Sequence, residues 1–288
     1  MRRIVVGVDE SDGAAAALRW ALREGDLHGA TVVAVLAWGL LDQHRAGGDA
    51  EFDPDYGADD ADEALRAIVA GAAGDDAAAT IELQAVCDVP AKALLAAAEG
   101  ADLLVSGARG LGGFRGLLLG SVSQHLLHHS KVPIAIVRPP RNVGGESERI
   151  VVGVDGSDRS KAALAWAVAE ASVRDAVLVA AHAWRVPVVG EYPFSALPID
   201  PANYAATSEA LLDEVLGSAD VGALAGKVER ASVQGSAAGA LLELAESADL
   251  LVIGSRGLGG FKGMLLGSVA NQVARHAPCT VVVLPARD

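Results

Sequence analysis

Cysteine is scarce in this chain of 288 residues, which has only Cys87 and Cys279. The two thiols form no CxxC pair, and their spacing indicates neither a disulfide framework nor a zinc site. Sparse, unpaired thiols are typical of proteins that stay in a reducing compartment. We therefore expect a cytoplasmic protein.

Positive charge and long apolar runs are scarce as well. The 23 lysines and arginines face 37 aspartates and glutamates, for a formal net charge of −14. Nucleic-acid binding rests mainly on cationic side chains that displace counterions, so this balance argues against DNA or RNA as a partner. The longest apolar stretch, residues 30–41, is shorter than the roughly 20 residues of a membrane helix. Asp9, Glu10 and Asp12 end the first apolar run too early for a secretory signal, so we expect no membrane or export segment.

The chain contains an internal duplication. "RIVVGVDESD" at residues 3–12 returns as "RIVVGVDGSD" at residues 149–158. The glycine-rich stretch "GARGLGGFRGLLLGS" at residues 107–121 returns at residues 254–268 with twelve of fifteen positions identical. Such self-similarity at a fixed period indicates repeated domains. We predict two domains, residues 1–140 and 149–288, joined by a linker rich in proline and glycine.

Within each copy, short apolar runs alternate with helical patterns. Runs such as "RIVVGV" and "TVVVL" have no polar alternation, which is typical of strands buried on both faces of a parallel sheet. Helices on both sides of the sheet supply that burial. Each copy is therefore predicted to be a doubly wound α/β domain. Residues 39–60 and 185–202, rich in proline, glycine and acids, are predicted to be loops at the same place in both copies.

The glycine-rich stretch lies between a predicted strand and a predicted helix. A turn of this kind places unpaired backbone N–H groups at a helix N-terminus, which favours an anion such as phosphate. Ser121 and Ser268 are suitable N-cap residues for the following helices. Asp9 and Asp155 end the first strand of each copy, and ligands of such sheets bind beyond the carboxyl ends of the strands. We predict a nucleotide with its phosphates on the loop and its ribose near the aspartate.

Neither familiar nucleotide signature fits this loop, since Arg115 breaks G-x-G-x-x-G and no P-loop occurs. The spacing is Gly107-x2-Gly110-x9-Gly120-Ser121, and it recurs from Gly254. Together with "VVGVDxSD" in both copies, this pattern resembles the universal stress protein family, specifically its tandem-domain, ATP-binding branch. The resemblance covers nearly the whole chain.

The resemblance implies two tandem Rossmann-like (adenine-nucleotide alpha-hydrolase-like) domains, each with a five-stranded parallel sheet and helices on both faces. It implies that the domains pair through their last strands as a pseudo-dimer. It also implies one ATP per domain. Because about four negative charges on ATP must be offset within an acidic protein, we expect Mg²⁺ or Mn²⁺ on the phosphates. Whether tandem chains form a further homodimer, and which proteins they bind, stays open.

The resemblance also assigns nucleotide contacts, which include Ala37 and Ala183 as backbone partners of the adenine. In the first copy the implied residues are Gly7, Asp9, Ala37, Gly107, Ala108, Arg109, Gly110, Leu111, Gly112, Gly113, Gly120, Ser121 and Val122. In the second copy they are Gly153, Asp155, Ala183, Gly254, Ser255, Arg256, Gly257, Leu258, Gly259, Gly260, Gly267, Ser268 and Val269.

Alternative interpretations of these residues stay open. The loops can be structural turns without a ligand, and Asp9 and Asp155 can serve only as helix N-terminal acids. Arg109 and Arg256 can face either phosphate or solvent. We expect the loop glycines to be required because a Cβ would block a positive φ angle or close phosphate approach.

The predicted function is that of an ATP-binding regulator or sensor in the stress response. No G-x-S-x-G elbow occurs, and no residues are assigned to catalysis or to a protein-bound metal. His125, His128 and His129 are better explained by a favourable charge at a helix C-terminus than by a metal site. Two alternatives remain: slow ATP hydrolysis or other adenylate chemistry, with Asp9 or Asp155 orienting a metal or water, and a nucleotide-independent interaction module.

Overall fold

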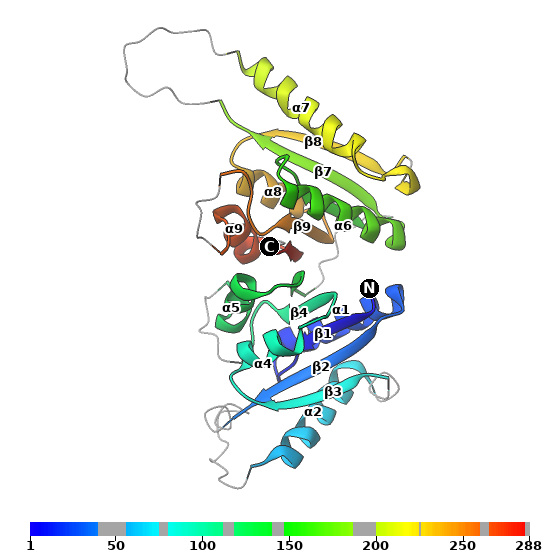
Figure 1. Ribbon diagram of the computed structural model, residues 1–288, viewed down its shortest axis with the longest axis vertical. Coiled ribbons are helices and arrows are strands. Elements are labelled where there is room, and N and C mark those ends of the chain that lie inside the picture. Colours follow the sequence, from blue (N-terminus) through cyan, green and yellow to red (C-terminus); the bar gives the residue numbers. More distant parts are fainter. Residues whose placement is uncertain are drawn as a thin grey trace, which may run out of the picture. The chain divides into compact units, whose positions relative to one another are not determined.

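The computed structural model describes residues 1–39, 56–74, 80–111, 118–139, 147–186, 200–224, 226–259 and 265–285. Helices and strands alternate along the described chain (Figure 1). The chain divides into two compact units: residues 1–141 with 274–288, and residues 142–273. The α/β prediction is confirmed.

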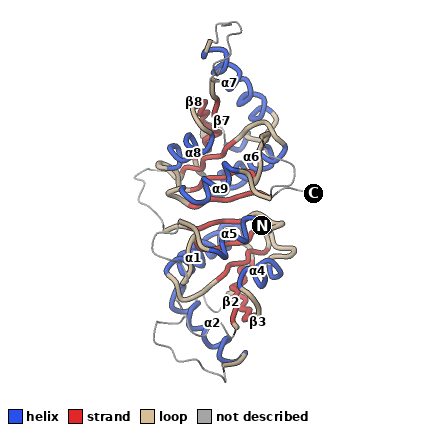
Figure 2. Tube along the Cα trace, turned by 90° about the vertical axis from the view of Figure 1, so that its left-hand side faces the viewer, coloured by secondary structure: helices blue, strands red, loops and turns tan. Residues whose placement is uncertain are grey.

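The first unit contains one sheet with the strand order β3-β2-β1-β4-β5-β10. The first five strands are parallel, and β10 pairs antiparallel with β5. Their helices lie on both faces, with α1 and α2 packed together and α4 packed on α5 (Figure 2). The elements are β1 (Arg3–Gly7), α1 (Asp12–His28), β2 (Thr31–Trp38), α2 (Ala58–Ala73), β3 (Glu82–Cys87), α4 (Pro90–Ala97), β4 (Leu103–Gly107), α5 (Ser121–His129), β5 (Ile134–Val137) and β10 (Thr280–Leu284).

The second unit repeats this order of elements. Its parallel strands are arranged β9-β6-β7-β8. The elements are β6 (Arg149–Gly153), α6 (Asp158–Arg174), β7 (Val177–Trp184), α7 (Pro201–Gly217), the short 3-10 helix η1 (Gly222–Leu224), β8 (Val228–Gln234), α8 (Ala237–Ala245) and β9 (Leu250–Gly254), and α9 (Ser268–His276) follows the second glycine loop.

The apolar strands form the core of each unit, as the sequence predicts. Ile4, Val5 and Val6 in β1 are fully buried, and the central residues of β4 and β9 are buried to the same degree. Burial of a strand on both faces explains why these runs lack polar alternation. Among the described residues, no helix has the length and apolar character that a membrane crossing requires.

Two predicted loops end earlier than the sequence suggested, because acidic side chains start helices there. The Asp60 carboxylate accepts the N–H of Gly57 at 2.8 Å, and α2 begins at Ala58. The Asp200 carboxylate accepts the N–H of Ala202 at 2.9 Å, and α7 begins at Pro201. The remaining parts of these predicted loops, residues 40–55 and 187–199, lie outside the described residues.

Candidate functional site

Asp155 joins the start of α6 to the glycine loop of the second unit. Its Oδ1 accepts the N–H of Ser157 at 3.1 Å and the hydroxyl of Ser157 at 2.6 Å. Its Oδ2 accepts the N–H of Leu258, in the glycine loop, at 2.8 Å. One carboxylate therefore fixes two segments that lie about a hundred residues apart in the sequence.

Asp9 makes the same connection in the first unit. Its Oδ1 accepts the N–H of Ser11 at 2.9 Å and also the hydroxyl of Ser11. Its Oδ2 accepts the N–H of Leu111 at 3.3 Å. The serine hydroxyl in turn accepts the N–H of Ala14 and caps α1. The sequence predicted that the aspartate would lie near the loop, but not that it would fasten the loop.

The hydrogen bonds also fix the charge of Asp155. Burial alone would raise the pKa of this carboxyl group, but the hydrogen bonds from Ser157 and Leu258 outweigh burial and hold the pKa below its ordinary value. The group is therefore ionised at neutral pH. A carboxylate with three donors already in place still has lone-pair capacity for one further donor, such as a ligand hydroxyl.

Four of the described loop glycines are explained by close approach of the chain to itself, because a Cβ on any of them would lie too close to a neighbouring residue and none has a positive φ angle. Gly107, Gly110, Gly254 and Gly257 are not among the described residues with positive φ. A Cβ on Gly107 would lie 2.6 Å from backbone atoms of Gly13, at the start of α1. The glycine at this position lets the end of β4 pass directly against the helix.

Each glycine loop closes on itself through one backbone hydrogen bond. Gly120 N–H donates to the carbonyl of Ala108 at 2.8 Å, and Gly267 N–H donates to that of Ser255 at the same distance. The last glycine of the family spacing is therefore the residue at which the loop returns to its own beginning. Gly112, Gly113 and Gly260, which the resemblance also assigns to the site, lie outside the described residues.

The N-terminus of α5 differs from the predicted arrangement. Its N-cap is Gly120, and Ser121 is already the first helical residue, so the prediction of Ser121 as the cap was wrong. Ser268 likewise begins α9 as a helical residue. Gly120 provides no side-chain cap, whereas Ser11 caps α1. The first N–H groups of α5, from Ser121 and Val122 onward, are thus left for water or a ligand.

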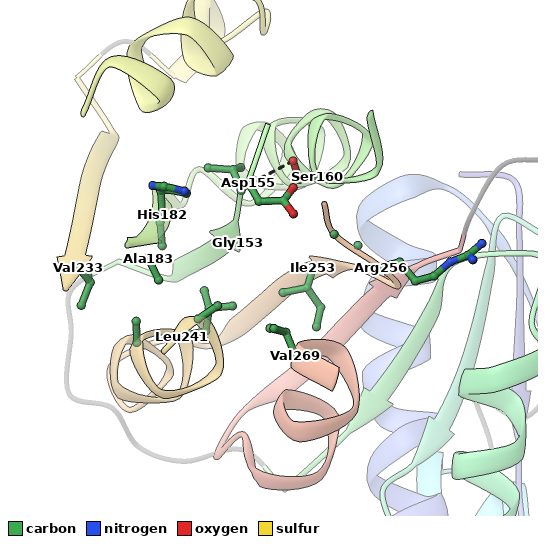
Figure 3. Close-up of a pocket in the computed structure, with 16 residues that line it drawn as sticks. Gly153, Asp155, Ser160, His182, Ala183, Val233, Leu241, Ile253, Arg256 and Val269 are labelled. Atoms are coloured by element: carbon green, nitrogen blue, oxygen red, sulfur yellow. Dashed lines mark hydrogen bonds between the residues drawn. The ribbon is translucent and has the colours of Figure 1, made fainter. Parts of the chain in front are cut away.

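A pocket in the second unit lies at the carboxyl ends of β6, β7 and β9 (Figure 3). It encloses about 580 Å³, part of which is open to solvent. Its apolar wall includes Val233, Leu241 and Ile253, and its polar wall includes Asp155 and Ser160. Seven residues assigned by the resemblance line it: Gly153, Asp155, Ala183, Gly254, Arg256, Gly257 and Val269.

The other assigned residues of the second unit flank this pocket. Ser255, Leu258 and Gly259 continue the glycine loop beyond Gly254, and Leu258 contributes its N–H to Asp155. Ser255 is buried, with 4% of its surface exposed. Figure 3 shows the Arg256 guanidinium extending away from Asp155 and His182. The side chain is half-buried and its Nε is buried, so it is not a fully solvated arginine.

In the first unit, corresponding residues occupy the same positions at the carboxyl ends of the strands. A Cβ on Gly7 would lie 2.8 Å from Leu94 Cδ1 in α4, and one on Gly153 would lie 2.9 Å from Leu241 Cδ1 in α8. Ala37 occupies the same strand-end position in β2 as Ala183 in β7. Ala108 and Arg109 follow β4 as Ser255 and Arg256 follow β9.

His182 is a pocket residue that the sequence analysis missed. It lines the pocket beside Ala183, and its Nδ1 lies 2.8 Å from Ser208 Oγ in α7. Burial lowers the pKa of His182, and the negative charge of Asp155 opposes this shift only in part. The one available signal was its position directly before the predicted adenine contact.

The histidines of α5 contact one another in the last turns of the helix. The rings of His125 and His129 stack with centroids 4.1 Å apart. Nδ1 of His129 lies 2.9 Å from the carbonyl oxygen of His125, one turn earlier. Burial and the two neighbouring histidines lower the pKa of His128.

Comparisons with known proteins identify the family of this chain. The model of the universal stress protein family matches residues 1–138 and 146–285. A universal stress protein of Mycolicibacterium smegmatis is 35% identical, with 99% of this chain and 97% of that protein covered. One from Mycobacterium tuberculosis is 34% identical, covering 97% of this chain and 95% of the relative. The crystal structure of a universal stress protein from Archaeoglobus fulgidus superposes with a TM-score of 0.69 at 24% identity, over 98% of both chains. The chain therefore belongs to the universal stress protein family.

Proposed function

We propose that this protein is an ATP-binding regulator or sensor that holds one adenine nucleotide in each domain. The observation that carries the proposal is the repeated connection of an aspartate carboxylate to the glycine loop, Asp9 to Leu111 and Asp155 to Leu258. The connection places the loop beside the carboxyl ends of the central strands, where ligands of doubly wound sheets bind.

The phosphates would lie on the glycine loop and at the N-terminus of the following helix. In the first domain, α5 starts without a side-chain cap, so its N–H groups and its dipole can act on an anion. By contrast, Ser11 and Ser157 occupy the N-termini of α1 and α6 with their own hydroxyl groups. α2 and α4 also lack a side-chain hydrogen bond from their N-cap residues, but α5 is the one of these helices that follows the glycine loop, which supports a phosphate site there.

The nucleoside would occupy the pocket of the second domain. This pocket is open to solvent on one side, so a ligand can enter it at the carboxyl ends of the strands. Leu241, Ile253 and Val233 offer an apolar wall for a base, and Asp155 offers an acceptor for a ribose hydroxyl. An ionised carboxylate accepts such a hydrogen bond more strongly than a neutral group does.

A divalent cation fits this chemistry through the phosphates. ATP carries about four negative charges, which need compensation in a protein of net charge −14. Mg²⁺ usually keeps several waters and binds through substrate phosphates with one or two carboxylates. Asp155 already accepts three hydrogen bonds from the chain, so its part is to hold the loop and the ribose rather than to provide several metal ligands.

Two measurements test the proposal. Mass spectrometry of small molecules released from denatured protein should find adenine nucleotide, and calorimetry of nucleotide-free protein should find two ATP sites. Gly110→Ala and Gly257→Ala should each remove one site, since each Cβ would clash with the aspartate of its own domain. Absence of any released nucleotide together with absence of ATP binding would contradict the proposal.

The distinction between a regulator and an enzyme needs a separate assay. A regulator should keep bound ATP intact over many hours. Phosphate release that disappears in Asp155→Asn and Asp9→Asn protein, while ATP binding persists, would instead establish hydrolysis. Partner capture that is unchanged by ATP and by both glycine variants would identify an interaction module.

A further inference from the structure

A chain of three hydrogen-bonding side chains lies behind the pocket of the second domain. Ser232 Oγ in β8 donates to Ser208 Oγ in α7 at 2.8 Å. Ser208 Oγ lies 2.8 Å from Nδ1 of His182, which lines the pocket. Ser208 is buried, with 1% of its surface exposed. A buried hydroxyl group of this kind is costly unless its hydrogen bonds are satisfied.

Among its described residues, the first domain has no counterpart of this hydrogen-bonded chain. His182 pairs with Ser232 across β7 and β8, and the same register pairs Leu36 with Ala85 across β2 and β3. The buried Ala61 of α2 occupies the place that Ser208 has in α7, by the repeat spacing of 147 residues (208 − 61 = 147, as 254 − 107 = 147). An apolar trio in one domain is therefore replaced by a polar trio in the other.

The hydrogen bond between Ser208 and His182 is coupled to the protonation of the imidazole. Ser208 Oγ accepts the hydroxyl hydrogen of Ser232, and its own hydrogen can be donated to His182 Nδ1, which lies 2.8 Å away. A neutral imidazole that accepts at Nδ1 carries its hydrogen on Nε2. With Nδ1 held by Ser208 and the ring in the pocket wall, Nε2–H is the group left for a ligand.

We propose that His182 is a specificity-determining residue of the second site, where its Nε2–H donates to a ring-nitrogen acceptor of the bound purine. The inference rests on the proposed nucleotide function and adds a difference between the two sites. Asp155 is an acceptor suited to ribose hydroxyls, whereas the imidazole is a donor and needs an acceptor, and purine ring nitrogens only accept. In the first domain, Leu36 stands at this position and offers no donor. The first site would therefore select its ligand by shape and backbone contacts.

The test isolates the second site by using Gly110→Ala protein, in which the first site is blocked. Calorimetry would compare ATP with its 1-deaza, 3-deaza and 7-deaza analogues, each of which replaces one ring nitrogen with C–H. One analogue should bind about 2- to 12-fold more weakly than ATP, the range of one net hydrogen bond. In His182→Leu protein, the affinity for ATP should fall by the same factor. The affinity for that analogue should be no lower than the affinity for ATP.

Two further variants separate recognition from folding. His182→Gln places an amide N–H near the Nε2 position and should recover part of the ATP affinity. His182→Leu with Ser208→Ala and Ser232→Ala reproduces the apolar trio of the first domain, so it should fold and still show the weakened, analogue-insensitive binding. The first site, measured in Gly257→Ala protein, provides the matched control and should be unchanged by the triple replacement.

The outcomes distinguish this inference from the proposed function. If both sites bind ATP and neither affinity changes in His182→Leu protein, the inference about His182 is wrong but the proposed function stands. If the affinity falls only for a 2′-deoxy or 3′-deoxy analogue and for none of the deaza analogues, His182 contacts the ribose, and the proposed base contact is wrong. Absence of ATP binding at both sites would overturn both proposals. ¹⁵N spectra of the His182 ring check the tautomer without any ligand, and a hydrogen on Nδ1 of the neutral ring would also count against the inference.

Discussion

Gly257 has no side chain because Asp155 lies where one would be: a Cβ built on Gly257 would stand 2.1 Å from Oδ2 of Asp155. The same relationship holds between Gly110 and Asp9, at 2.5 Å. Oδ2 of each aspartate accepts the N–H of the residue that follows its glycine. The glycine and the aspartate are thus one unit, and neither can change without displacing the loop.

Gly257→Ala should therefore disrupt the second site and destabilise its domain. Overpacking of this kind costs about 1 to 3 kcal/mol, and the displaced loop can no longer present its N–H groups to a phosphate. ATP stoichiometry by calorimetry should fall from two to one, with a lower midpoint of unfolding. Gly259→Ala is the matched control in the same loop, since no described atom lies within 4 Å of a Cβ built there. Equal effects of the two variants would disprove the steric explanation.

Asp155→Asn should loosen the loop without changing the volume of the side chain. An asparagine has one acceptor oxygen, so its amide group must face either the donors of Ser157 or the N–H of Leu258. The loss of one such bond should lower the free energy of unfolding by about 1 to 2 kcal/mol. Denaturant unfolding measures this difference. Asp158→Asn, at an exposed position in the first turn of the same helix, should lower the free energy of unfolding by less. A larger decrease in the Asp158 variant would mean that the loss of negative charge at the helix N-terminus, and not the loop hydrogen bond, explains the effect.

Gly120→Ser should separate the stability of the first domain from its ligand binding. Gly120 has φ −73° and ψ 158°, which any residue adopts, and a Cβ would lie 3.6 Å from the carbonyl oxygen of Ala108, an ordinary contact. The new hydroxyl would cap α5 and raise the free energy of unfolding by a few tenths of a kcal/mol. Because the cap occupies the N–H groups proposed for phosphate, ATP affinity of the first site should fall about 2- to 10-fold. Gly120→Ala lacks the hydroxyl and should leave the ATP affinity nearly unchanged, while it lowers the free energy of unfolding by a few tenths of a kcal/mol because alanine is a poorer N-cap residue than glycine. Tighter ATP binding in the serine variant would contradict the phosphate assignment.

The stability of the second domain should fall as the pH drops below about 6.5. Burial lowers the pKa of His182 in the folded state below the ordinary value of 6.5, and Asp155, the charged group that acts on the ring, offsets this only in part. The unfolded chain therefore binds the proton at a higher pH than the folded chain does, and protonation favours unfolding between the two pKa values. Denaturant unfolding at a series of pH values should show this slope reduced in His182→Leu protein. A slope identical to that of the parent protein would mean that His182 is not its source.

Much of the site could be predicted because its signals are local in the sequence. The position of residues 107–121 between a strand and a helix, together with the spacing of Gly107, Gly110 and Gly120, predicts a phosphate-binding loop from the sequence alone. His182 could not be predicted in this way. Its hydrogen bond to Ser208 comes from a helix 26 residues later, and strand propensity carries no information about which helix covers a given strand end.

The sequence by itself determined the duplication, the alternation of strands and helices, and the placement of the glycine loops and of Asp9 and Asp155 at strand ends. These features follow from apolar periodicity and repeated spacing, which are properties of neighbouring residues. Only the tertiary structure decided that each aspartate fastens its loop, that Gly120 leaves α5 without a side-chain cap, and that the second domain has a polar trio where the first domain has an apolar one. Parallel strands bring together residues about a hundred positions apart at one edge of the sheet, and the atoms that meet there depend on packing that no local pattern encodes.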